Sequence, residues 1–356
     1  MIKLAIVVGA RPQFIKLSPV LEAFDGYADL ILIHTGQHYD FEMSDIFFNQ
    51  LGLKSPDYHL GIGAMTNAGQ TGAMLTALDD VFRKEKPGMV IVTGDTNSTL
   101  AGALASAQNR IPLTHIEAGL RARDKFLPEQ INRVLTDRLS NILCCPTQVA
   151  VDNLANEGIR EGIALTGDVL YDIIRKFMPD ESKSQEILDL FGLKRGYYIY
   201  LTTHRAENVD NPQFLERLID TLSKIEMPVF FPIHPRTMKN ILANKFGDKL
   251  ASLPHLIVSK PIGIIESLAV TQSAVGIITD SGGLQREAAY FGKKTYVLRD
   301  ETEWVELEQG GIVESIGKSI NRTSFEWGGR FTLPIDYFKS ASNDIAKLIL
   351  ESPLTA

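Results

Sequence analysis

Short apolar runs that alternate with helical segments constrain the fold of this chain more than any other feature. Most of the runs are nearly continuous in Ile, Val and Leu, which is typical of strands buried on both faces of a parallel sheet. The segments between them carry apolar residues three and four positions apart, as amphipathic helices do. The alternation therefore predicts an α/β fold with right-handed crossovers. The runs are Lys3–Val8, Leu30–His34, Met89–Thr93, Leu113–Ile116, Ile142–Cys145, Ala164–Thr166, Tyr197–Thr202, Val229–Ile233, Leu256–Val258, Val275–Thr279, Lys294–Leu298 and Ile312–Val313.

The pattern changes between Gly167 and Gly196, where a charged helical sequence precedes a new strand at Tyr197. Since a domain usually holds about 150 residues, the 356 residues fit two domains. We therefore predict two Rossmann-like doubly wound domains, residues 1–168 and 169–356, that face each other across a cleft. The sequence does not decide on which domain the final helical segment, Ala341–Glu351, packs.

Composition excludes several classes of protein. The formal net charge is -7 and 44% of the residues are hydrophobic, so the chain lacks the basic surplus of a nucleic-acid binder. It contains no apolar run long enough to span a membrane, and its first residues lack a signal-peptide pattern. The adjacent Cys144 and Cys145 do not fit a disulfide framework. We expect a cytoplasmic protein without nucleic-acid or membrane partners.

Polar residues gather where the predicted strands end, which is where open α/β sheets bind their ligands. One such cluster is explained by helix capping and turn formation alone. Six clusters drawn from both halves of the chain instead predict a ligand site. They are Gly9–Lys16, Gly94–Ser98, Glu117–Arg121, Thr203–Asn208, His234–Arg236 and Asp280–Gly283.

The turn Asp280–Gly283 carries the clearest binding signal. Ser281, Gly282 and Gly283 stand between a strand and a helical segment, where helix N–H groups are exposed to an anion such as a diphosphate. A plain helix cap is the alternative interpretation. The chain has neither a Walker A sequence nor a strand-linked G-x-G-x-x-G, so neither ATP hydrolysis nor NAD binding is indicated. No histidine spacing supports a metal site, and none is expected.

Acid–base groups form the second signal. Asp95, Glu117 and Glu129 belong to the first half of the chain and His204 to the second. Carboxylates at strand ends can act as general acids or bases when they become buried. The pair Glu129 and Arg133, four residues apart, is also typical of plain helix stabilisation.

The chain resembles the non-hydrolysing UDP-N-acetylglucosamine 2-epimerases over almost its whole length. The resemblance rests on nine ordered motifs: Gly9–Lys16, Thr35–His38, Gly94–Thr96, His115–Arg121, Pro128–Arg133, Thr166–Asp168, Thr203–Arg205, Thr279–Gly283 and Leu298–Asp300. It implies a glycosyltransferase type B-like fold, a homodimer, and a C-terminal helix that crosses back onto the first domain. It also implies a UDP-sugar substrate that is inverted at C2 without a cofactor, through elimination of UDP to a 2-acetamidoglucal and re-addition.

The resemblance assigns roles to particular residues. Asp95, Glu117, Glu129 and His204 match the acid–base groups of the family, although the sequence does not decide which of them removes the C2 proton. Glu287 matches a residue that holds the ribose hydroxyls. The other residues expected to bind the substrate are Arg11, Lys16, Arg133, Arg205, Ser281, Gly282, Gly283 and Arg299.

Four places depart from the commonest family pattern. Gln13 replaces a Glu, Arg286 replaces another Glu, and the segment Asp300–Glu306 differs from the usual form. The segment Gln37–Met43 lacks the string that is associated with allosteric binding of a second UDP-sugar in bacterial members of the family. The sequences around Gln13 and at Asp300–Glu306 resemble those of the family branch that epimerises UDP-2,3-diacetamido-2,3-dideoxyglucuronic acid. UDP-N-acetylglucosamine is therefore the first expected substrate, with the diacetamido-uronate as the alternative and a hydrolysing 2-epimerase as a further one.

Overall fold

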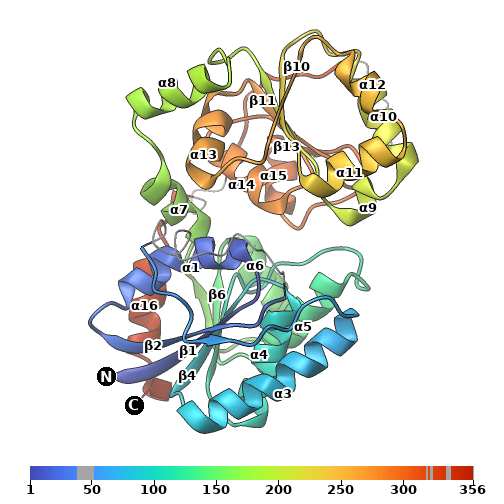
Figure 1. Ribbon diagram of the computed structural model, residues 1–356. Coiled ribbons are helices and arrows are strands. Elements are labelled where there is room, and N and C mark those ends of the chain that lie inside the picture. The colour runs from blue at the N-terminus through green and yellow to red at the C-terminus, as the bar shows by residue number, and fades with distance from the viewer. Residues whose placement is uncertain (38–51, 318–319, 321–323, 334–337, 356) are drawn as a thin grey trace. The chain divides into compact units, whose positions relative to one another are not determined.

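A computed structural model describes residues 1–37, 52–317, 320, 324–333 and 338–355; the side chain of Arg11 is not described. The chain forms two compact units (Figure 1). Unit 1 comprises Met1–Ile173 and Ile335–Ala356, and unit 2 comprises Ile174–Pro334. The division predicted at residues 168 and 169 lies directly before α7 (Val169–Phe177). That boundary, and the cleft predicted with it, stay predictions.

Unit 1 is built on a parallel seven-stranded sheet of order β3-β2-β1-β4-β5-β6-β7. Its strands are β1 (Ile2–Val8), β2 (Ala28–His34), β3 (Tyr58–His59), β4 (Met89–Thr93), β5 (Leu113–Ile116), β6 (Ile142–Cys145) and β7 (Ile163–Leu165). Its helices are α1 (Arg11–Ala23), α3 (Asn67–Glu85), α4 (Asn97–Gln108), α5 (Pro128–Leu139), α6 (Gln148–Asn156) and α16 (Ser342–Leu350), with a short 3-10 turn at Pro353–Thr355.

Unit 2 contains a parallel six-stranded sheet of order β10-β9-β8-β11-β12-β13. Its strands are β8 (Ile199–Thr202), β9 (Val229–Pro232), β10 (Leu256–Ser259), β11 (Gly276–Thr279), β12 (Thr295–Val297) and β13 (Val313–Ser315). Its helices are α8 (Glu181–Leu190), α9 (Ala206–Val209), α10 (Pro212–Leu222), α11 (Pro235–Ala243), α12 (Gly247–Ala251), α13 (Ile264–Ser273), α14 (Gly282–Tyr290) and α15 (Val305–Gln309).

Both sheets are buried on their two faces, as the continuous apolar runs predict. In unit 2, Ile199 and Leu201 belong to one apolar cluster, whereas Tyr198 and Tyr200 belong to another. Successive side chains of a strand point to opposite faces, so helices must cover each face of this sheet. The prediction of two doubly wound α/β units is confirmed. The two-residue strand β3 has no counterpart among the predicted strands, because it is too short to show a periodicity.

The C-terminal helix α16 packs against α1 in unit 1 (Figure 1). The carboxylate of Asp172 fixes the start of this helix, since it accepts hydrogen bonds from the backbone N–H groups of Ala341 and Ser342, at 2.9 and 2.8 Å. The hydroxyl of Ser342 donates to the same oxygen at 2.6 Å. The described helices include none long and apolar enough to cross a membrane.

Candidate active site

The strand order places four of the six predicted polar clusters at the reversal points of the two sheets. In unit 1 the order reverses between β1 and β4, which are followed by the turns at Gly9 and at Gly94. In unit 2 it reverses between β8 and β11, which are followed by His204 and by Ser281. Ligands of open parallel sheets bind beyond the carboxyl ends of strands at such points. Each unit therefore presents a candidate ligand-binding edge.

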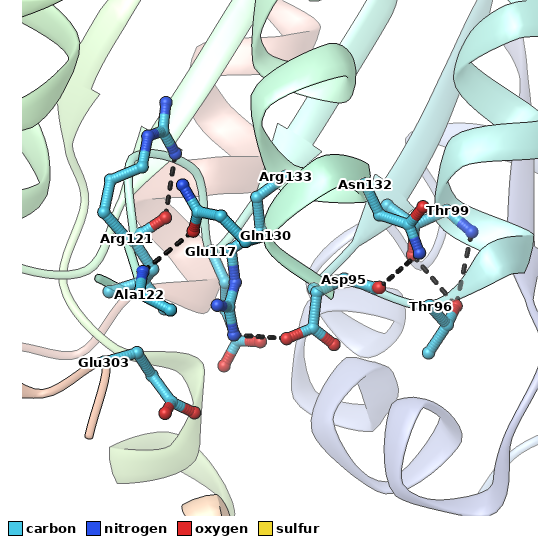
Figure 2. Close-up of polar contacts among 12 residues, drawn as sticks. Asp95, Thr96, Thr99, Glu117, Arg121, Ala122, Gln130, Asn132, Arg133 and Glu303 are labelled. Carbon is cyan, nitrogen blue, oxygen red and sulfur yellow. Dashed lines mark hydrogen bonds and ion pairs between the residues drawn. The ribbon is translucent and has the colours of Figure 1, made fainter. Parts of the chain in front are cut away.

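Asp95 lies on the turn after β4 and is held from α5. Its carboxylate forms an ion pair with the guanidinium of Arg133 (Figure 2). The carbonyl oxygen of Asp95 accepts a hydrogen bond from Nδ2 of Asn132 at 2.8 Å (Figure 2). Arg133 is buried, whereas the side chain of Asp95 is 29% exposed. The carboxylate is thus oriented by a buried cation and keeps an accessible side.

Glu117 lies on the neighbouring turn, after β5. Its backbone adopts a left-handed conformation with φ of 67°, which is uncommon for a residue other than glycine. The carboxylate is 5% exposed and lies 3.1 and 3.0 Å from Nζ of Lys16 on α1. A Cβ atom added to Gly94 would lie 3.4 Å from Oε2 of Glu117, so the turns that carry Asp95 and Glu117 are adjacent.

The resemblance assigns Lys16 and Arg133 to substrate binding. In the structure Lys16 contacts Glu117, and Arg133 contacts Asp95. Glu129, the third predicted carboxylate, lies half-buried in the first turn of α5. Arg11 begins α1, but its side chain lies outside the described part of the chain, as does the last residue of the motif Thr35–His38.

Gln13 is a connecting residue whose role the sequence did not reveal. Its Oε1 atom accepts hydrogen bonds from the N–H groups of Gly9 and Ala10 at 2.8 and 3.2 Å. Its Nε2 atom donates to the carbonyl oxygen of Thr93 at 2.8 Å. Because an amide both accepts and donates, this buried side chain joins the turn after β1 to the end of β4.

In unit 2, the buried carboxylate of Asp280 organises the turn that carries His204 and Arg205. It accepts hydrogen bonds from the backbone N–H groups of His204 and Arg205, both at 3.0 Å. It also accepts from Oγ1 of Thr203 at 2.7 Å and from Nδ2 of Asn208 at 3.1 Å. The sequence places Asp280 in a turn that fits either an anion site or a plain helix cap, whereas the structure shows a fully buried acceptor. The concentration of polar residues after β8 and β11 was the only signal for this role.

Ser281 caps α14, and Gly282 and Gly283 are the first two residues of this helix. The hydroxyl of Ser281 accepts a hydrogen bond from the N–H of Leu284 at 3.3 Å, which is the arrangement of an N-terminal cap. The plain-cap interpretation is therefore correct for this side chain. The helix start with two glycines remains suited to an anion, because the N-terminus of a helix presents N–H donors and a positive dipole.

The last two predicted residues lie near this helix. Glu287 is half-buried on α14. Nη1 of Arg299, which follows β12, lies 2.8 Å from Oε2 of Glu303. Since a Cβ atom added to Gly282 would lie 3.0 Å from Oε1 of Glu303, the Arg299–Glu303 pair lies against the start of α14. Across the described ranges, no group of three or more His, Cys, Asp and Glu side chains could hold a metal ion.

Two parallel-sheet α/β units with polar carboxyl edges, one of them with a helix start suited to an anion, define a protein of the glycosyltransferase type B-like fold class. Residues 23–322 match the family model described as UDP-N-acetylglucosamine 2-epimerase. The chain therefore belongs to the UDP-N-acetylglucosamine 2-epimerase family, whose members are isomerases.

Individual relatives agree with this assignment. The chain is 45% identical over 341 residues to a UDP-N-acetylglucosamine 2-epimerase homolog of Methanococcus maripaludis, covering 92% of this chain and 95% of that protein. It is 44% identical over 341 residues to the UDP-2,3-diacetamido-2,3-dideoxy-D-glucuronate 2-epimerase of Pseudomonas aeruginosa, covering 90% and 93%. The crystal structure of the Methanocaldococcus jannaschii UDP-GlcNAc 2-epimerase in complex with UDP-GlcNAc and UDP is similar with a TM-score of 0.85, at 36% identity over 99% of this chain and 100% of that one.

Proposed function

We propose that this protein interconverts UDP-N-acetylglucosamine and UDP-N-acetylmannosamine by inverting C2 of the sugar. The observation that carries the proposal is the pair Asp95 and Glu117, two carboxylates on adjacent turns, each oriented by a cation from a different helix. Removal of a proton from carbon and its return to the other face both need acid–base groups that are fixed in position. A protein that only binds a UDP-sugar has no need of such groups.

The proposed reaction is an elimination followed by an addition. A base removes the C2 proton while the C1–O bond breaks, its electron pair leaves with UDP, and a C1–C2 double bond forms. UDP then adds back at C1, and a proton is delivered to the opposite face of C2. Asp95, Glu117, Glu129 and His204 are the candidate acids and bases for these steps. A positive charge that develops on the sugar ring is stabilised by the nearby carboxylates.

The leaving group determines the role proposed for unit 2. The start of α14, at Ser281–Gly283, would stabilise the negative charge of the diphosphate with its N–H groups, assisted by Arg299 and by the predicted cations Arg11 and Lys16. Arg205 and Arg133 complete the predicted substrate contacts, and Glu287 would hold the ribose hydroxyls. The homodimer stays a prediction that rests on the resemblance.

Incubation with UDP-N-acetylglucosamine in D2O tests this proposal. We expect deuterium to appear at C2 in both epimers, together with UDP-N-acetylmannosamine, without added cofactor. Accumulation of UDP and free N-acetylmannosamine with no returning UDP-sugar would instead indicate a hydrolysing enzyme. Absence of both C2 exchange and epimer, for this substrate and for the uronate analogue below, would refute the proposed function.

The diacetamido-uronate is the second candidate substrate. It is supported by the 44% identity to the Pseudomonas aeruginosa enzyme, which is about the same as the 45% identity to the UDP-N-acetylglucosamine 2-epimerase homolog of Methanococcus maripaludis. The forms of Gln13 and of Asp300–Glu306 favour the same branch. A competition assay that offers both UDP-sugars together would decide between them through the ratio of the two kcat/KM values.

A further inference from the structure

A buried polar network lies behind the turns that carry Asp95 and Glu117. Its centre is the carboxylate of Asp137 on α5, which is 1% exposed. Oδ1 of Asp137 lies 2.6 Å from Nδ1 of His115, whose ring is completely buried at the end of β5. Oδ2 accepts hydrogen bonds from Nη1 of Arg121 at 2.7 Å and from the N–H of Gly119 at 3.2 Å. None of these four residues has a role in the proposed function.

His115 joins the turn after β4 to α5 through its two ring nitrogens. Nε2 lies 2.8 Å from the carbonyl oxygen of Gly94, which accepts but does not donate, so this nitrogen is the donor. Nδ1 lies 2.6 Å from the Asp137 carboxylate. Burial acts to raise the pKa of Asp137, but its contacts with His115 and Arg121 outweigh this effect and hold the pKa below its usual range. The ring thus links the buried carboxylate to the turn that carries Asp95.

Arg121 pairs with two carboxylates of this network. Nε and Nη2 of Arg121 lie 2.6 and 2.8 Å from the two carboxylate oxygens of Glu157, a bidentate pair, and Nη1 donates to Asp137. A buried ion that is fully paired and hydrogen-bonded is tolerated, whereas one that loses its partner is strongly destabilising. The buried carboxylate of Asp137 is thus a paired group rather than a lone charge.

The network connects the two turns of the candidate active site. Gly94, which accepts from His115, directly precedes Asp95 in the chain. Gly119, which donates to Asp137, follows two residues after Glu117, whose left-handed backbone needs support from its surroundings. The same helix also supplies Arg133, which forms an ion pair with the carboxylate of Asp95. One buried carboxylate on α5 therefore restrains both turns at once.

We propose that Asp137 and His115 are positioning residues, which fix the two turns and thereby the separation of the Asp95 and Glu117 carboxylates. The inference rests on the proposed function, because it assumes that these carboxylates act on the substrate. Neither Asp137 nor His115 contacts the substrate in this proposal. Their loss should therefore lower kcat much more than it changes KM, since a misplacement of about 1 Å can cost about 100-fold in rate.

Two substitutions of His115 each remove one of its two hydrogen bonds. In His115→Gln, the amide nitrogen lies near the place of Nε2, so the bond to the carbonyl of Gly94 is kept and the bond to Asp137 is lost. In His115→Asn, the amide nitrogen lies near the place of Nδ1, so the bond to Asp137 is kept and the bond to Gly94 is lost. Thr114→Val is the matched control, because Thr114 is equally buried on β5 and its hydroxyl contacts only the sulfur of Met89 among the described residues.

The kinetic test measures kcat, KM and the unfolding midpoint of the three variants and the parent. We expect His115→Asn and His115→Gln each to lose about 100-fold in kcat with KM changed less than about threefold, because each breaks one of the two bonds that join Asp137 to Gly94. Thr114→Val should retain kcat. Parent-like kcat in either His115 variant would overturn the proposal. Losses of kcat that follow the unfolding midpoint in every variant would also overturn it.

A second readout does not depend on activity. In 1H–15N NMR spectra of histidine-labelled protein, we expect a slowly exchanging ring N–H signal from His115, because the ring is completely buried and Nε2 lies 2.8 Å from the carbonyl oxygen of Gly94. That signal should vanish in His115→Gln. Its absence from the parent protein refutes the link to Gly94. If the parent fails to exchange the C2 proton of either UDP-sugar while this signal is present, the proposed function fails and the link between Asp137 and Gly94 is retained.

Discussion

Gly9, directly after β1, lies close to the start of α4. A Cβ atom added at Gly9 would lie 1.8 Å from Oγ and 2.7 Å from Cβ of Ser98. It would also lie 2.9 Å from Oγ1 of Thr35. Non-bonded carbon atoms pack at about 3.5–4.0 Å, so the substitution Gly9→Ala requires movement of the surrounding chain. We predict that Gly9→Ala destabilises unit 1.

The size of the effect follows from what Ser98 contacts. Its buried hydroxyl lies 2.8 Å from Oγ1 of Thr35 and donates to Oε1 of Gln37 at 2.7 Å. Rotation of this side chain breaks both bonds, at about 1 kcal/mol each, and leaves Cβ of Ser98 still too close. Overpacking with backbone shifts costs about 1–3 kcal/mol more, while alanine stabilises by about 0.4–1 kcal/mol through the unfolded state. The net loss is about 2–4 kcal/mol.

Calorimetric unfolding measures this loss, with Gly72→Ala as the matched control. Gly72 is exposed within α3, and a Cβ atom there meets nothing within 4 Å. The same chemical change should therefore stabilise the protein at Gly72, by about 0.5–1 kcal/mol. For Gly9→Ala we expect the melting temperature of unit 1 to fall by about 4–16 °C, because 1 kcal/mol corresponds to about 2–4 °C for a unit of this size.

A double-mutant cycle identifies the cause. Ser98→Gly removes the two atoms closest to the added Cβ. It should therefore lower the free energy of unfolding less in the Gly9→Ala protein than in the parent, with a favourable coupling energy of at least about 1 kcal/mol. A parent-like melting temperature for Gly9→Ala would refute the reasoning. Additive effects of the two substitutions would refute it equally, because they would show that Ser98 is not the obstruction.

Three further predictions test the site and its surroundings. Asp95→Asn and His204→Ala should each lower kcat by at least about 100-fold while far-UV circular dichroism remains unchanged; near-normal turnover in both would exclude the assigned roles. Burial and the nearby His59 lower the pKa of His34 from 6.5 to about 4. As the pH falls, this histidine therefore becomes protonated in the unfolded chain before it does so in the folded protein. Up to about 3 kcal/mol of stability should be lost between about pH 6.5 and pH 4, and urea unfolding of His34→Leu should lack that part of the loss; an identical pH dependence would contradict the shift. Ser281→Ala should cost about 1 kcal/mol of stability through the lost cap and weaken UDP binding several-fold by calorimetric titration, whereas unchanged affinity would argue against an anion site at α14.

The pattern of the sequence predicted the sheets well because parallel strands are buried on both faces. The strands at Met89–Thr93, Leu113–Ile116 and Ile142–Cys145 have the predicted bounds. The strand around residue 199 is shorter at its start than predicted, because Tyr197 is exposed and lies before the ladder begins. Tyr58 and His59 gave no signal, since a two-residue edge strand has no period.

Ordered motifs at strand ends determined, from the sequence alone, that this chain is an α/β protein of the epimerase family with polar carboxyl edges. Only the tertiary structure decided which residues meet there. Lys16 and Glu117 are 101 positions apart in the chain, and His115 reaches Gly94 across neighbouring strands. Sequence periodicity reports which face of an element is buried, but not which side chain of another element lies opposite. Asp137 and Asp280 accept hydrogen bonds from residues of other elements. Their roles are therefore determined by the tertiary structure, which brings these elements together.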